Sequence, residues 1–83
     1  MLKVGDIVRF KGFPHSGSFA LYMLKSTKYR YHSQDSVFVV SYIEPLAYMG
    51  NVTLVASDST EFVFYCDCSG FNISSRMRLE VIT

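Results

Sequence analysis

The stretch NVTLVASDSTEFVFYC, Asn51 to Cys66, predicts two β-strands joined by a polar turn at Ser57-Asp58-Ser59. Apolar residues recur at every second position on both sides of that turn, and a period of two is typical of a strand with one buried face. The side chains expected to face a core are those of Val52, Leu54, Phe62 and Phe64. Those expected to point away from it are Thr53, Glu61 and Tyr65.

Further strands are predicted on both sides of this hairpin. SVFVVSYI, Ser36 to Ile43, is β-branched and aromatic with apolar residues on both faces, which favours a strand covered on two sides. At the start of the chain, VGDIVRFKGF alternates so that Val8 and Phe10 share an inward face. At its end, MRLEVI predicts a last strand with Leu79 and Val81 inward.

The segment from residue 16 to residue 34 remains open between two structures. It is compatible with a short helix capped by Ser16 or Ser18, or with a strand whose inward residues are Phe19, Leu21 and Met23. With this segment as one long early loop that holds a short helix or a strand, the pattern predicts an all-β fold: a five-stranded antiparallel barrel.

Length and composition restrict the classes of protein. A chain of 83 residues is expected to form one domain, residues 1–83, and 49% hydrophobic residues exclude a disordered chain. A net charge of +1 gives no general field for holding a polyanion. No apolar run reaches the length of a membrane span, and the start of the chain lacks a signal-peptide core. We therefore expect a soluble cytoplasmic protein, located in the host cytoplasm if the chain is viral.

The order of elements resembles the Src-homology-3-like small β-barrel of Tudor domains, KOW domains and stand-alone phage or prokaryotic accessory proteins. The resemblance lies in VGDIVRF (Val4 to Phe10), in the hairpin from Gly50 to Cys66 and in RLEVI (Arg78 to Ile82). It implies a binding edge formed by residues 11–35 and 44–49. It also implies a non-catalytic module, such as a phage or mobile-element accessory factor or inhibitor of a host component.

Aromatic residues supply the first candidate site. Six tyrosines and seven phenylalanines exceed what the interior of one small barrel holds, so some must lie at the surface. Tyrosine is enriched at protein interfaces, although tyrosines at a barrel rim need no partner. The predicted partner-binding residues are Tyr22, Tyr29, Tyr31 and Tyr48, with Tyr42 and Tyr65 as further members of a protein-facing patch.

The segment KSTKYRYH, Lys25 to His32, supplies an alternative site because cations pair with phosphates while rings stack on bases. The candidate nucleic-acid-binding residues are Lys25, Lys28, Arg30 and His32. An extended segment would place Lys28, Arg30 and His32 on one face and the two tyrosines on the other. The segment is then also compatible with a solvated loop whose rings pack on the barrel.

No catalytic or metal chemistry is indicated. Cys66 and Cys68 are separated by a single residue, whereas structural zinc sites usually have two or more between paired cysteines. We expect a buried, unreactive Cys66 and a partly exposed Cys68, with no cofactor and no enzymatic activity. The predicted function is therefore protein binding, with nucleic-acid binding and a homo-oligomeric structural role as the alternatives.

Overall fold

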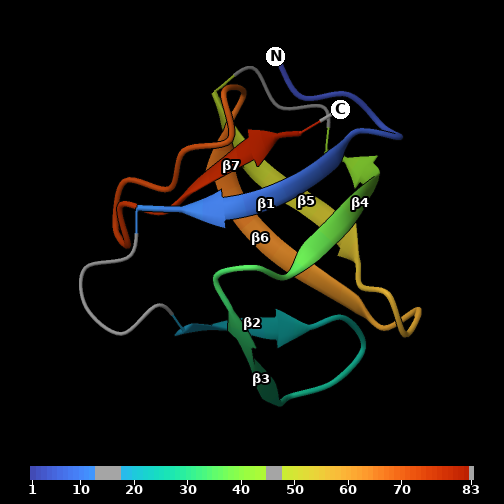
Figure 1. The fold of residues 1–83 in the computed structure, drawn as a ribbon. Coiled ribbons are helices and arrows are strands. Elements are labelled where there is room, and N and C mark those ends of the chain that lie inside the picture. Colours follow the sequence, from blue (N-terminus) through green and yellow to red (C-terminus); the bar gives the residue numbers. More distant parts are fainter. Residues whose placement is uncertain (13–17, 45–47, 83) are drawn as a thin grey trace.

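A computed structural model describes residues 1–12, 18–44 and 48–82, and its secondary structure there is all β. No helix long and apolar enough to cross a membrane occurs in these residues. All strand pairs are antiparallel, in one sheet of order β3-β2-β6-β5-β4-β1-β7 (Figure 1). The seven strands are β1 (Ile7–Lys11), β2 (Ser18–Met23), β3 (Tyr29–Ser33), β4 (Val37–Ile43), β5 (Met49–Val55), β6 (Glu61–Asp67) and β7 (Arg78–Val81).

The sheet curls so that strands far apart in its order meet across an interior. β1 and β2 are four places apart in the sheet, a separation of about 19 Å if the sheet were flat. The rings of Phe10 on β1 and Phe19 on β2 nevertheless lie 4.7 Å apart, centroid to centroid. Phe10 also meets Phe64 of β6 edge-on, at 4.8 Å. The concave face of the sheet therefore encloses the core.

That core is built from alternating inward residues on six strands, and the sequence predicts inward residues on four of them, β1, β5, β6 and β7. Full burial of a large apolar side chain contributes about 1.5–3 kcal/mol, so these residues supply most of the driving force for folding. Buried on the inner face are Val8, Phe10, Phe19, Leu21, Phe38, Val40, Val52, Leu54, Phe62, Phe64, Cys66 and Leu79.

The prediction of five strands is wrong, because the segment left open as a loop forms two more. Residues 18–23 and 29–33 pair as an antiparallel hairpin, so the helix alternative fails over the described part of the segment. Phe19 and Leu21 are buried and Met23 partly so, as the strand alternative requires. Residues 13–17, which include the proposed capping residue Ser16, lie outside the described residues.

Two predictions about strand faces also fail. Strand β4 is covered on one face only: Val37 and Val39 are 43% and 41% exposed, since its second face lies on the outside of the curl. Val81 is 43% exposed although Leu79, two residues earlier, is buried. Val81 belongs to the last residues of a strand at the edge of the sheet, where the core no longer reaches.

The two edges of the sheet are the short strands β7 and β3, and another segment of the chain runs along β7 but not, among the described residues, along β3. Residues 70–71 run along the open side of β7, where the Leu79 amide donates to the Gly70 carbonyl at 2.9 Å and Phe71 bridges Arg78. Strand β3 pairs only with β2 among the described residues. The β2–β3 hairpin therefore projects from the curled sheet with one open edge (Figure 1).

Candidate protein-binding surface

The convex face of the sheet carries a continuous row of side chains across five neighbouring strands. Cross-strand partners lie opposite each other, so their side chains touch on the same face. The register pairs Tyr29 with Tyr22, Tyr22 with Val63, Val63 with Thr53, and Thr53 with Tyr42. We call these five residues, Tyr29, Tyr22, Val63, Thr53 and Tyr42, the tyrosine row.

Three of the five members of the tyrosine row are tyrosines, and their side chains are accessible to solvent. Tyr29 is 65% exposed, Tyr42 56% and Tyr22 36%, and the rings of Tyr22 and Tyr29 meet edge-on at 5.0 Å. Thr53, between Val63 and Tyr42, is only 9% exposed although it points away from the core. The row is thus a ridge of tyrosines at both ends with a hollow over Thr53 between them.

A β-bulge places Tyr42 in this row. Val40 pairs with Leu54, but the next pair is Tyr42 with Thr53, so Ser41 is the extra residue on β4. Because side chains alternate along a strand, an extra residue moves every later side chain to the opposite face. Without the bulge, Tyr42 would point inward with Val40. With it, Tyr42 faces solvent and Ile43 packs against the core.

Tyr31 and Tyr65 extend the same surface. Tyr31 is 77% exposed and lies two residues after Tyr29 on β3, so both rings are on the convex face. Tyr65 is 51% exposed and lies two residues after Val63 on β6. Three of the four predicted partner-binding tyrosines, Tyr22, Tyr29 and Tyr31, are therefore gathered on one hairpin.

Tyr48, the fourth, lies elsewhere. It is 78% exposed and lines a second groove of about 360 Å³ with the N-terminal residues, Glu44, Asn51 and the exposed Cys68. Cys66, which also lines that groove, is 2% exposed. Burial, with a smaller effect from the Asp67 charge, raises the pKa of its thiol to about 12. Cys66 is thus held as a neutral thiol.

Arg30 and His32 do not share the face of the tyrosines on β3. Arg30 is 42% exposed on the opposite face, where its guanidinium donates to Asp58 at 2.8 Å and lies 5.6 Å from the centre of the Phe62 ring. The alternative in which Tyr29 and Tyr31 pack on the barrel is wrong, because both rings are exposed and the opposite face of β3 packs on the barrel. Lys25 and Lys28 are exposed near the turn of the hairpin.

His32 is part of the interior aromatic cluster. Its ring stacks on Phe19 at 5.6 Å and meets Phe62 and Phe38 edge-on at 4.7 and 5.2 Å. Its Nε2 is buried and has no hydrogen-bond partner among the described residues. Burial, followed by the charge of Arg30, lowers the pKa of His32. This histidine therefore stabilises the hairpin's attachment to the core as a neutral ring.

Asp58 completes the polar contact of that hairpin with the β5–β6 turn. Hydrogen bonds from the Thr60 backbone, the Thr60 hydroxyl and Arg30 lower the pKa of Asp58 to about 2. The sequence offered no signal for this partner of Arg30, since 28 residues separate the two.

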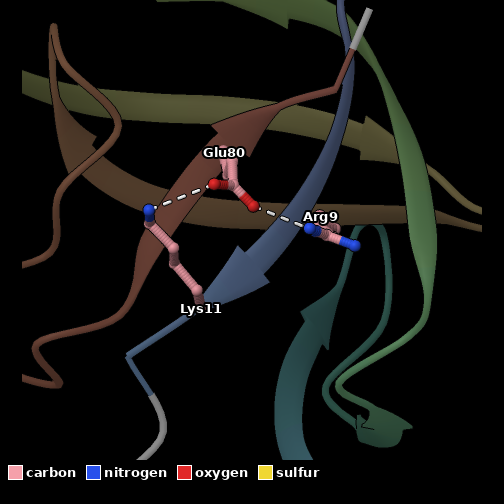
Figure 2. A network of polar contacts seen from close by, with 3 residues as sticks. All are labelled: Arg9, Lys11 and Glu80. Atoms are coloured by element: carbon pink, nitrogen blue, oxygen red, sulfur yellow. Dashed lines mark hydrogen bonds and ion pairs between the residues drawn. The ribbon is translucent and has the colours of Figure 1, made fainter.

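Charged residues mark the far end of the convex face. Figure 2 shows Glu80 of β7 between Arg9 and Lys11 of β1. Its carboxylate accepts hydrogen bonds from Arg9 Nε at 3.0 Å and from Lys11 Nζ at 3.1 Å. Those bonds, Arg9 first, lower the pKa of Glu80. Both cations are thus already paired with a carboxylate.

Among residues 1–12, 18–44 and 48–82, no three histidine, cysteine or acidic side chains gather in a way that would hold a metal ion. Comparisons of the chain with protein-family models, with curated protein sequences and with solved structures each find no significant match.

Proposed function

We propose that this protein is a non-catalytic Src-homology-3-like module that binds another protein through the tyrosine row and Tyr31. The order of the strands supports the resemblance. The five strands that correspond to the prediction, β6-β5-β4-β1-β7, are consecutive neighbours in the sheet. The β2–β3 hairpin is inserted between β1 and β4, where such barrels have their long first loop.

The single observation that carries the binding proposal is the alignment of Tyr29, Tyr22 and Tyr42 across the convex face. Tyrosine offers a large contact area with few rotatable bonds and a hydroxyl that tolerates water in the free state. Contiguous exposed aromatic surface on a small domain is typical of an interaction site. The surface belongs to hydrogen-bonded strands of one sheet, whose backbone is already ordered before binding, so little ordering entropy is lost.

The arrangement favours a protein over a nucleic acid as the partner. Single-strand binding needs cations beside the rings on which bases stack. Here Arg30 is paired with Asp58, and His32 is a neutral, partly buried ring against Phe19, Phe38 and Phe62; both lie on the face opposite Tyr29 and Tyr31. Lys25 and Lys28 remain for phosphate contacts. Titration with short oligonucleotides at rising salt tests this alternative, and salt-dependent affinity lost in Lys28→Ala would favour it.

The test of protein binding is capture from an extract of the natural host with the chain immobilised. We expect a stoichiometric partner that is retained by the wild type and lost by Tyr22→Ser and Tyr29→Ser. Tyr48→Ser is the matched control, since it removes a tyrosine outside the row that is more exposed than Tyr22 and Tyr29. A partner lost only with Tyr48→Ser, or retained by all variants, would contradict the proposal.

A further inference from the structure

A groove on the convex face adjoins the tyrosine row and is lined by two carboxylates. It holds about 640 Å³, is open to solvent and has Thr53 of β5 in its lining. Tyr42 and Val63, members of the tyrosine row, lie on either side of Thr53, so the groove is continuous with the proposed interface. Its described lining is Leu24, Ser41, Tyr42, Glu44, Asn51, Thr53, Glu61 and Val63.

The groove has a carboxylate at each end and no cation in its described lining. Glu44 is joined to Asn51, two residues before Thr53, by hydrogen bonds of 2.9 and 3.0 Å. Glu61 pairs with Val55, two residues after Thr53. Neither glutamate forms an ion pair within residues 1–12, 18–44 and 48–82.

The strand register fixes the separation of these charges. Glu44 and Glu61 are on the two strands that flank β5 and lie in opposite directions along it from Thr53. Spacings of about 3.3 Å per residue and 4.8 Å between strands put their Cα atoms about 16 Å apart. An extended peptide presents residues i and i+4 on one side about 13 Å apart, and long side chains cover the remainder.

We propose, on the basis of the binding function above, that this groove takes an extended basic segment of the partner protein. A lysine or arginine at position i pairs with Glu44 or Glu61, a second at i+4 pairs with the other, and a small apolar residue at i+2 lies over Thr53. The charged group of one of these side chains lies over the ring of Tyr42, because a cation is stabilised on an aromatic face. The groove thus selects two positive charges at a fixed spacing.

The test is fluorescence anisotropy at low salt with a labelled heptapeptide, Thr-Arg-Thr-Val-Thr-Arg-Thr, whose β-branched residues favour an extended chain. Two comparison peptides replace both arginines by glutamate or place them side by side. Glu44→Gln retains the acceptor for the Asn51 amide, and Glu61→Gln is its counterpart. Asp35→Asn, in the β3–β4 turn, changes the net charge equally and lies outside the groove.

We expect the spaced arginine peptide to bind more tightly than both comparison peptides. Each glutamine variant should weaken it about two- to fivefold, as loss of an exposed ion pair does, while Asp35→Asn leaves it unchanged. Equal binding of the glutamate peptide, or equal weakening by Asp35→Asn, overturns the inference. If a captured partner depends on Tyr22 and Tyr29 but not on Glu44 or Glu61, the inference fails and the proposed function stands. If the tyrosine variants keep the partner, the proposed function fails.

Discussion

Closure of the sheet predicts an energetic coupling between Phe10 and Phe19. Their rings touch at 4.7 Å although their strands are four places apart, so the contact exists only if the sheet curls. The exposed fractions are 2% for Phe10 and 6% for Phe19, and Phe10 meets Phe64 as well. Each substitution to leucine should lower the free energy of unfolding by about 1–2 kcal/mol. The two changes together should cost less than their sum by about 0.5–1.5 kcal/mol, the usual worth of an aromatic pair.

The assay is urea unfolding of the wild type, both single variants and the double variant, followed by far-ultraviolet circular dichroism. A domain of this size is expected to unfold with about 4–12 kcal/mol, so all four proteins remain measurable. The control cycle combines Phe19→Leu with Tyr65→Ser, because Tyr65 is 51% exposed on the convex face. Those two changes should add within about 0.3–0.5 kcal/mol. A coupling between Phe10 and Phe19 that is no larger than in the control would refute the closed interior.

Three further outcomes follow from groups described above. The pKa of His32 in the folded protein lies below its ordinary value of 6.5, so as pH falls below 6.5 the unfolded chain binds a proton that the folded protein does not. The free energy of unfolding should therefore fall as pH drops from 7.5 to 5, and it should fall less steeply in His32→Phe. An equal slope in the two proteins would contradict the burial of the His32 Nε2. An aromatic disulfide reagent at pH 7.5 should modify Cys68 at once and Cys66 only at the rate of unfolding, so two fast thiols in the folded protein would be inconsistent with the core. Gly70→Ala should cost about 1–3 kcal/mol, since φ is 88° and the new Cβ would lie 3.1 Å from a β7 side chain; Gly5→Ala, at φ 97° with nothing within 4 Å, should cost less in the same urea assay.

The sequence pattern predicted the inner face of β5 and β6 because an apolar residue occupies every second position there. Val52, Leu54, Phe62 and Phe64 are all buried, and Tyr65 is exposed as expected. The same reasoning was insufficient where the backbone departs from that period. One extra residue at Ser41 reverses the faces of β4, and nothing in SVFVVSYI distinguishes a bulge from regular alternation.

The segment from residue 16 to residue 34 could not be assigned because its short apolar run fits a helix or a strand equally well. Tertiary contacts accompany the strand: the Phe19 ring stacks on His32 of β3 and lies 4.7 Å from the Phe10 ring of β1, and no local pattern shows either contact. The candidate tyrosines were predicted individually, but their alignment depends on pairing between β2 and β6. The sequence separation of Tyr22 and Val63 in that pairing is 41 residues, beyond the reach of any local pattern.

The most direct measurement is a ¹H–¹³C spectrum of the chain labelled only at tyrosine, recorded before and after addition of the captured partner. The six tyrosines let one sample compare the proposed binding surface with the surface around Tyr48. The proposed surface predicts that the signals of Tyr22, Tyr29 and Tyr42 shift or broaden while that of Tyr48 stays in place. A spectrum in which Tyr48 alone responds, or in which the three signals of the tyrosine row are unchanged at saturation, would contradict it.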